Sequence, residues 1–502
     1  MGFEGTVDSA FVLRGTVEGR FLPSVPRGWS ERLGFCQETW WGKAELDGQM
    51  RIELDAARSP SWWTPVRPCF SVRERWQATV SCLGRSFLGA STDVLTQTEC
   101  SPPPAPSLPA LPVPEPELAL AMSEAGDGLL LWVEPGRGAD VPPTLRFREF
   151  AGGAGAPADR VETLVSGYVG SPAVAFVGPG TSLAVWVQSR LPLETAREAS
   201  QGALLESAEL KAVLRRDGTW QEPVALTDDS VADGSPVLVA TEEGARLFWL
   251  RAEAPGEGMS VYGARFVTDS GWQMDGRLSP PAELVRELAA GFSGGAVHVA
   301  WTEVLPTGEP RLWVRSLGPE GWSGASVLAL PAGLWPSGLQ FWDEAESPRL
   351  LFRGVDATSG GGPGGRLYLA ERGMSGWSVR ALPGTEGVDR AWVTKGSATP
   401  AWVVYRKIGS GSAEEGNGDL WAISLGGGSA SPAVALSTDG WGHGNLVGAS
   451  QRGGSIWIAD VHRQTPVDPP VVGVHRFDLL PDLVVDTVTW QYASGEDPSA
   501  SL

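Results

Sequence analysis

Several residue types are scarce in this chain of 502 residues, and each shortage narrows what the protein can be. No apolar run reaches the roughly 18 residues of a transmembrane helix, so no membrane span is expected. The 39 Lys and Arg residues form no cluster, and the formal net charge is −20, which disfavours nucleic acid and anionic lipid as partners. No charged segment followed by an apolar run opens the sequence, so no signal peptide is visible. Met1 is either the native start or a start that follows removal of a leader.

Cysteine is both scarce and confined to one region. The four cysteines, Cys36, Cys69, Cys82 and Cys100, all lie in the first hundred residues. An even number in a small region predicts two disulfides and an oxidising compartment, hence an extracellular, cell-surface or periplasmic protein. The spacing leaves the pairing open. Free thiols are the alternative, and a zinc site is disfavoured because no C-x₂-C pair occurs.

Histidine is scarce as well, and its placement argues against metal catalysis. The four histidines, His298, His443, His462 and His475, form neither H-x₃-H nor H-E-x-x-H. No glycine-rich phosphate motif stands between a strand and a helix. We therefore expect no cofactor and no catalytic metal. A structural calcium ion stays open, because acidic loops are many although no EF-hand spacing occurs.

What the chain has in quantity is glycine and proline, which predict many turns and short elements. Residues 101–116, "SPPPAPSLPALPVPEP", predict a semi-rigid linker between an N-terminal β domain (1–100) and a C-terminal domain (117–502). In the first domain, "ETWWGKAELDGQMRIELDAA" alternates on both sides of Asp47-Gly48, which is typical of a hairpin. We expect a small, disulfide-bearing β-sandwich with a Trp-rich core; paired Trp residues as a sugar platform are the alternative.

The C-terminal domain repeats. An apolar strand such as "LLLWV", "LAVWV" or "RLFWL" recurs with one equivalent position at intervals of 51 to 63 residues. These equivalent positions are Trp132, Trp186, Trp249, Trp301, Phe352, Tyr405 and Ala459. A strand precedes each of them and two more follow, with no helix between. Four strands in about 53 residues is typical of a propeller blade.

Seven such units predict an all-β fold, a seven-bladed β-propeller. A solenoid has a similar period, but distinct capping repeats are absent. The second unit is longer because residues 191–207, "LPLETAREASQGALLES", are inserted, and their pattern predicts a short helix.

The turn between the third and fourth strands often ends in Gly-Trp or Thr-Trp, at Trp220, Trp272, Trp322 and Trp377. The segment "RRDGTW", with Asp217 and Gly218, resembles the Asp-box of bacterial neuraminidase repeats, in a degenerate form. The resemblance covers the repeat region and implies a sialidase-like propeller. It implies that these hairpins lie on the face away from the active site. We expect Gly to take the positive φ of the turn and Trp to pack back between blades.

A ligand site is therefore expected at the ends of the second strands. These ends carry Glu134, Arg190, Arg251, Glu303, Arg353, Arg406 and Asp460. The sialidase resemblance implies three arginines around a carboxylate and a Tyr–Glu nucleophile. The early "RIP"-type motif is missing, however, and Tyr405 falls on a core position. Charged strand ends are more often solvated or paired between blades.

Acidic residues in turns are the other candidates for chemistry. Paired carboxylates of a different glycoside hydrolase would have to come from Asp228, Asp229, Asp233, Asp343, Glu344 and Glu346. We expect these six to be solvated and to cap turns. His298 lies within a core strand pattern.

We therefore expect a non-catalytic secreted or cell-surface binding protein, of bacterial type, for a protein or glycan ligand. The predicted ligand surface is Trp335, Trp441, His443, Arg251, Arg353 and Arg406, with no catalytic and no metal-ligating residue. A sialidase-like glycoside hydrolase is one alternative. The other is a structural subunit of an extracellular filament or surface assembly, joined to its partner through the N-terminal domain.

Overall fold

The computed structural model describes most of the repeat region and four strands before it. The described residues are 11–20, 41–54, 66–82, 85–98, 116–123, 125–136, 141–150, 161–252, 258–268, 270–280, 285–305, 307, 309–342, 347–356, 365–373, 376–395, 401–408, 418–426, 429–430, 432–436, 442–452, 455–463, 471–479 and 485–492. Most of the linker, Cys36 and Cys100 lie outside them.

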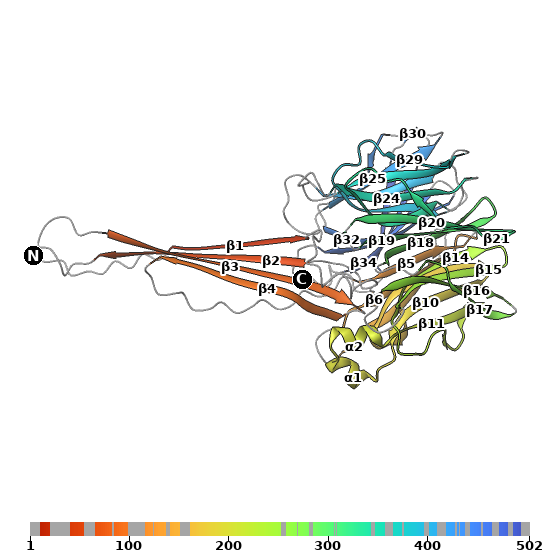
Figure 1. Cartoon of the computed structure of the whole chain (residues 1–502), viewed down its shortest axis with the longest axis horizontal. Coiled ribbons are helices and arrows are strands. Elements are labelled where there is room, and N and C mark those ends of the chain that lie inside the picture. The colour runs from red at the N-terminus through yellow and green to blue at the C-terminus, as the bar shows by residue number, and fades with distance from the viewer. Residues whose placement is uncertain are drawn as a thin grey trace, which may run out of the picture.

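The N-terminal strands form one antiparallel sheet in the order β1-β2-β3-β4, not the expected sandwich. Their bounds are β1 Phe11–Arg20, β2 Trp41–Leu54, β3 Val66–Cys82 and β4 Arg85–Thr98. Asp47 and Gly48 lie inside β2, paired with β1 on one side and β3 on the other, so the hairpin expected there is wrong. An Asp-Gly pair permits a turn but does not force one when both neighbouring strands continue. Figure 1 shows the sheet running away from the repeat region.

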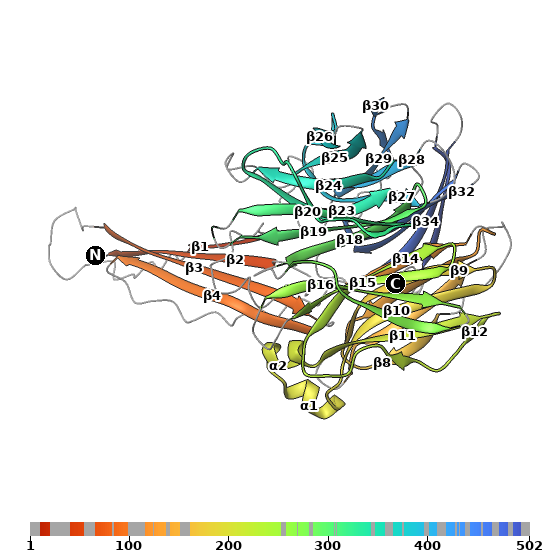
Figure 2. The ribbon, with the colours of Figure 1, turned by 45° about the vertical axis from the view of Figure 1, so that its right-hand side comes forward.

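The repeat region is a ring of antiparallel units of four or five strands. Figures 1 and 2 show their sheets side by side. The first unit is β5 Leu118–Met122, β6 Gly128–Glu134, β7 Thr144–Phe150 and β8 Glu162–Ser166. The second is β9 Val169–Gly178, β10 Thr181–Ser189, β11 Ala208–Arg216, β12 Thr219–Trp220 and β13 Val224–Ala225, with helices α1 Leu193–Glu198 and α2 Gln201–Glu206 between β10 and β11. The third is β14 Asp233–Thr241, β15 Gly244–Ala252, β16 Met259–Val267 and β17 Gly271–Arg277.

The remaining units complete the ring. The fourth is β18 Val285–Ser293, β19 Ala296–Val304, β20 Pro310–Gly318, β21 Gly321–Trp322 and β22 Ser326–Leu328. The fifth is β23 Leu334–Trp342, β24 Arg349–Asp356, β25 Arg366–Gly373 and β26 Gly376–Ala381. Then follow β27 Val388–Lys395, β28 Ala401–Ile408, β29 Gly418–Gly426, β30 Ser429–Ala430 and β31 Val434–Ala435, and finally β32 Gly442–Arg452, β33 Ser455–Arg463, β34 Val471–Leu479 and β35 Val485–Tyr492. The first strand of each unit packs on that of the next, and β32 packs on β5 to close the ring.

The propeller has six blades, so the expectation of seven separate blades is corrected. The last two repeat units share one nine-stranded sheet, because their innermost strands β27 and β32 pair in parallel. Thr394 and Lys395 are the residues of β27 in this pairing, opposite Ala449 and Ser450. The last two repeats of the sequence thus form one blade, because their first strands are close enough to form backbone hydrogen bonds with each other.

The core lies on the second strands, as the repeat predicts. The seven equivalent positions, Trp132, Trp186, Trp249, Trp301, Phe352, Tyr405 and Ala459, are all buried, with at most 3% of their surface exposed. Two of the hairpin tryptophans pack against the preceding blade, as expected, whereas Trp272 meets Phe266 of its own blade at 5.3 Å. Trp220 meets Phe147 of the preceding blade edge-on at 5.3 Å, and Trp322 meets Phe248 in the same way at 6.0 Å. Asp217 and Gly218 take positive φ angles of 47° and 82° in the turn between β11 and β12.

The insertion in the second blade forms helices α1 and α2, in agreement with the helical pattern of residues 191–207. Ser200 caps α2 by accepting a hydrogen bond from the Ala203 amide. The Ser189 and Ser207 hydroxyls, 2.7 Å apart, tie the two ends of the insertion together. Neither helix of the described chain is long and apolar enough to cross a membrane.

Candidate functional site

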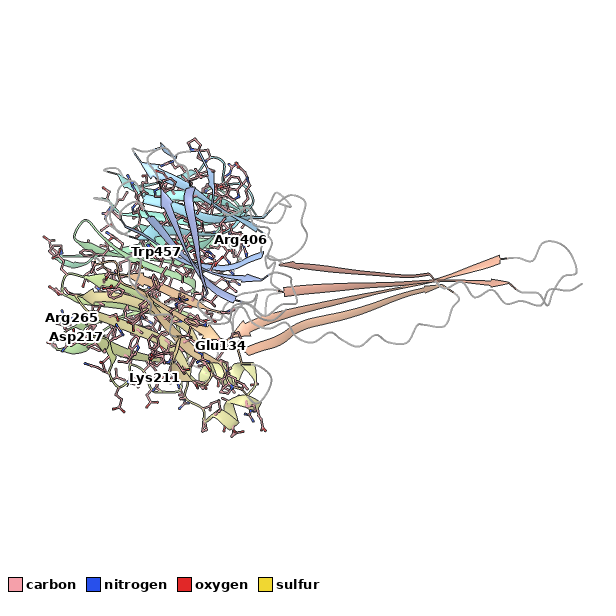
Figure 3. The ribbon with its side chains drawn as sticks, turned by 180° about the vertical axis from the view of Figure 1, so that it is seen from behind. Glu134, Lys211, Asp217, Arg265, Arg406 and Trp457 are labelled. Carbon is pink, nitrogen blue, oxygen red and sulfur yellow. The ribbon has the colours of Figure 1, made fainter. Side chains whose placement is uncertain are left out.

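The two faces of the ring differ in what they carry. The turns after first and third strands open on one face, which we call the hairpin face. The loops after second and fourth strands open on the other, which we call the loop face. Figure 3 shows Asp217 and Arg265 at the edge of the ring away from the β1–β4 sheet, and Glu134 and Arg406 at the edge toward it. The helical insertion lies on the loop face, because it follows second strand β10.

Three acidic side chains of the described chain converge on the loop face between the second and third blades. Glu209 is the second residue of β11, directly after the helical insertion. Asp229 lies in the connection from β13 to β14, and Asp233 begins β14. Arg251, near the end of β15, stands opposite Asp233 in the strand register. We call these four residues the blade-junction cluster.

Hydrogen bonds fix every member of this cluster. Arg251 donates from Nη1 to Asp233 Oδ2 at 2.7 Å and from Nη2 to Asp229 Oδ2 at 2.5 Å. Asp233 also accepts from Trp249 Nε1 at 2.7 Å. The Asp229 amide donates to Glu209 Oε1 at 2.8 Å. The Arg251 guanidinium therefore binds the carboxylates of Asp229 and Asp233. The Glu209 carboxylate binds the backbone of the loop that carries Asp229.

Burial sets the protonation of the acids. Glu209 and Asp233 have 1% and 0% of their surface exposed, while 46% of the Asp229 side chain is exposed. Burial raises the pKa of Glu209 to about 7, and the neighbouring carboxylates act in the same direction. Burial also raises the pKa of Asp233 to about 6, against the opposing charge of Arg251. For Asp229 the bonds and charge of Arg251 outweigh partial burial, and they lower its pKa.

This arrangement limits what the cluster can do chemically. A carboxyl that acts as acid, base or nucleophile must reach the reacting atoms of a substrate. Glu209 and Asp233 are covered by protein, so they do not offer such contact. Their raised pKa values are caused mainly by burial, which is a structural cause. The outer rim, with Asp229 and the exposed Arg190, is what solvent or a ligand meets.

The three arginines of the predicted ligand surface do not share one binding site. Arg251 belongs to the blade-junction cluster, whereas Arg353 and Arg406 meet at Asp389 of β27. Arg353 donates to the Asp389 carbonyl at 2.7 Å and to Ser337 Oγ at 2.9 Å. Arg406 is buried and pairs with the Asp389 carboxylate. Each of the three guanidinium groups thus forms hydrogen bonds with other residues of the propeller.

The aromatic part of the predicted surface is only partly described. Trp335 is the second residue of β23 and is half-buried, opposite Val355 in the register. His443 lies on β32 opposite His462, and Trp441 lies outside the described residues. The expected ligand surface of Trp335, Trp441 and His443 therefore stays a prediction.

The three acidic residues at second-strand ends are bound within their own blade. Glu134 pairs with Arg146 at 2.7 Å, Glu303 accepts from Trp313 Nε1 at 2.7 Å, and Asp460 meets His475 at 2.5 Å. Tyr405 is buried, and burial raises its pKa to about 12. It therefore does not serve as an exposed nucleophile, and its expected core position is confirmed.

Sequence reasoning named three of the four cluster residues and misjudged one of them, Asp233. Asp229 caps a turn by accepting from the Val231 amide at 2.8 Å, as expected of the turn acids. Asp233 is fully buried, so the expectation that it is solvated is wrong. Asp343, Glu344 and Glu346 lie outside the described residues. Glu209 was missed; its one signal is a carboxylate standing in an apolar strand directly after the insertion.

No family model matches the sequence, and no curated protein matches it. Solved structures do match the fold. The polysaccharide lyase Uly1 superposes with a TM-score of 0.50 at 8% identity, over 72% of this chain and 90% of the lyase. A lectin of Aleuria aurantia, complexed with α-methyl-L-fucoside, covers 75% of this chain and 94% of its own at 8% identity and a TM-score of 0.35. A subtype N11 neuraminidase-like protein (A/flat-faced bat/Peru) matches 71% of this chain and 85% of its own chain, at 8% identity and a TM-score of 0.33.

These likenesses concern architecture. The fold is an all-β propeller built of repeated blades, with polysaccharide lyase, lectin and neuraminidase-like propellers among its structural neighbours. At 8% identity the shared feature is the blade arrangement, and function has to be argued from the site itself.

Proposed function

We propose that the protein is a non-catalytic binding protein that presents the loop face of its propeller to a ligand. The observation that carries the proposal is the blade-junction cluster, whose buried acids fix the loops while Asp229 and Arg190 remain at the surface. Polar groups held in place before binding lose little freedom on binding, which favours affinity.

The chemistry of the rim favours a glycan over a protein ligand. Asp229 and Arg190 offer an acceptor and a donor for sugar hydroxyls, and Tyr262 is half-buried with its ring 5.7 Å from the Arg251 guanidinium carbon. A small number of fixed polar groups beside an aromatic ring is a common design of ligand sites. A ligand rich in hydroxyl groups matches this set.

A glycan array probed with the full chain tests the proposal. Asp229→Asn, which removes a rim charge, should weaken the array signal at least tenfold. Asp275→Asn is the matched control, because Asp275 pairs with Arg246 toward the other end of the same strand, β15, and it should bind as the wild type does. Release of reducing ends from bound glycans, measured beside the array, reports any hydrolase or lyase activity.

Three results would contradict the proposal in whole or in part. Turnover of a bound glycan by the wild type would favour the sialidase-like hydrolase or another glycosidase. Array binding that is equal in wild type, Asp229→Asn and Asp275→Asn would place the ligand elsewhere, for instance at the expected surface of Trp335 and His443. Binding of proteins but no glycan would redirect the proposal to a protein ligand.

A second candidate function, a subunit of a surface assembly, is favoured by the N-terminal sheet. Its strands are 10, 14, 17 and 14 residues long, and β1 and β4 are its two edges. Long edges can add a strand from another chain. Light scattering of the full chain across a concentration series tests this candidate: a monomer at all concentrations contradicts self-assembly, and growing oligomers support it.

The proposed location is extracellular, on the cell surface or in the periplasm, and it depends on the disulfides. Cys69 and Cys82 both lie on β3, thirteen residues or about 43 Å apart in an extended strand. They therefore cannot pair with each other. We infer that each pairs with Cys36 or Cys100. Mass spectrometry of an unreduced digest should find two such links, and four free thiols would contradict the proposed compartment.

A further inference from the structure

The blade-junction cluster has the makings of a cation site, and one of its acids, Asp229, also belongs to the proposed ligand rim. One carboxylate oxygen from each of Glu209, Asp229 and Asp233 lies within 4.8 Å of the other two. Oxygen ligands stand about 2.3–2.6 Å from a calcium ion, so any two of them are at most about 5 Å apart. We propose that these three residues bind a calcium ion at the junction of the second and third blades.

An unpartnered oxygen points to a ligand at this place. Glu209 is 1% exposed, and its Oε2 atom is buried without a hydrogen-bond partner. A buried carboxylate oxygen without a donor costs free energy, because its hydration is lost and not replaced. A bound cation supplies the missing partner.

The charge of the cluster also calls for a divalent cation. The three carboxylates carry three negative charges when ionised, and Arg251 returns one positive charge. When all three are ionised, as ligands of a cation are, the net charge of the group is −2. Arg190, which is exposed, contributes to the field at Asp229, while Glu209 Oε2 has no hydrogen-bond partner. A divalent ion brings the group to neutrality, as burial in a low-dielectric region requires.

The donor atoms select the kind of ion. All three ligands are carboxylates, and no histidine or cysteine belongs to the group found among the described residues. Oxygen ligands suit hard cations, and sulfur or imidazole would be expected for zinc. Calcium tolerates irregular geometry with protein ligands, whereas magnesium demands a near-octahedral shell and retains its waters. Calcium is therefore the ion to test.

The effect of the ion would be to join two blades. Glu209 belongs to the second blade and Asp233 to the third, and Asp229 lies on the connection between them. A shared ion adds a crosslink where the chain passes from blade to blade. The proposal does not rest on glycan binding and can stand if the array shows none.

The test uses the full chain, stripped with a chelator and then titrated with calcium chloride in a calorimeter. We expect one saturable site, and a melting temperature about 3 °C higher when free calcium is a hundredfold above the dissociation constant. Glu209→Gln keeps the shape of the side chain and should lose at least tenfold in affinity. Asp275→Asn should bind as the wild type does. Magnesium should bind at least tenfold more weakly.

Several outcomes would overturn the proposal. The absence of both heat and melting shift up to about 10 mM calcium, beyond the weak extracellular range, is one. Equal binding in wild type and Glu209→Gln is another, since it would reduce calcium to a counterion of the acidic surface. If Glu209→Gln fails to fold by circular dichroism, Asp229→Asn, at a half-exposed ligand, takes its place and must show the same loss.

Discussion

The two ends of strand β15 carry the same residue type in different surroundings. Arg246, toward the hairpin face, pairs with Asp275 at 2.6 Å, and both side chains keep some exposure, at 16% and 20%. Arg251, at the loop face, pairs with Asp233, which is fully buried, and with Asp229. The first pair joins strands of one blade, whereas the second belongs to a group that spans two blades.

This difference shows where the propeller places its costly interactions. Pairs near solvent gain little, because water and salt screen both charges. A buried ion pair has already lost its hydration, so removing one partner leaves the other charge buried and unpaired. The loop face therefore depends on its charges for order, while the hairpin face depends on turns and on tryptophans packed between blades.

The largest expected effect is at Asp233. In Asp233→Ala the Trp249 indole and one Arg251 nitrogen lose their buried acceptor. We expect the free energy of unfolding to fall by about 3 kcal/mol. Urea unfolding followed by tryptophan fluorescence, with chelator present so that loss of a bound ion does not contribute, measures this. A loss below 1 kcal/mol would show that the buried pair is no more valuable than a surface pair.

A somewhat smaller effect is expected for the hairpin tryptophans. Trp322→Ala removes the edge-on contact with Phe248 and the contact of Arg315 with the Trp322 ring. Because Trp322 is half-buried, we expect a loss of about 2 kcal/mol in the free energy of unfolding. Glycan-array binding should not change once the variant is folded. A selective loss of binding without a loss of stability would move the ligand to the hairpin face.

The hairpin face could be predicted from the sequence to a large extent. The turn at Asp217-Gly218, the tryptophan that follows it and the buried core position on each second strand are all local patterns. They depend on residues a few positions apart, which one sequence displays directly. The position of the helical insertion could be predicted because its pattern is also local.

The loop face and the blade count were predicted less well, because they depend on contacts between repeats. Nothing local in Glu209 says that Asp229 and Asp233 will close around it, and turn acids are usually solvated. The parallel pairing of β27 with β32, which merges two repeats into one blade, depends on how closely two first strands approach. Asp47-Gly48 is a strong turn sequence, but it lies within a continuous strand that pairs with a strand on each side.

A pH experiment sharpens the comparison of the two faces. His298, near the start of β19 on the hairpin side, is buried between Ser316 Oγ and the Ser293 carbonyl. Burial lowers its pKa below the ordinary value of 6.5. Stability from the neutral ring is thus complete above pH 6.5 and is lost as pH falls through the lower folded-state pKa. Between pH 7 and pH 4.5, the melting temperature of His298→Gln should fall by less than that of the wild type. An equal or larger fall would contradict a role of His298 in this pH dependence.

The smallest effect is expected at the other end of β15. Asp275→Ala leaves Arg246 with access to water, so the free energy of unfolding should fall by less than about 1 kcal/mol. The difference from the wild type should shrink further in 1 M salt, where the Debye length is about 3 Å. Urea unfolding at low and high salt measures both values. If Asp275→Ala costs as much as Asp233→Ala, or if its cost does not respond to salt, then the two ends of β15 are equivalent. In that case the charges of the loop face cannot be what orders it.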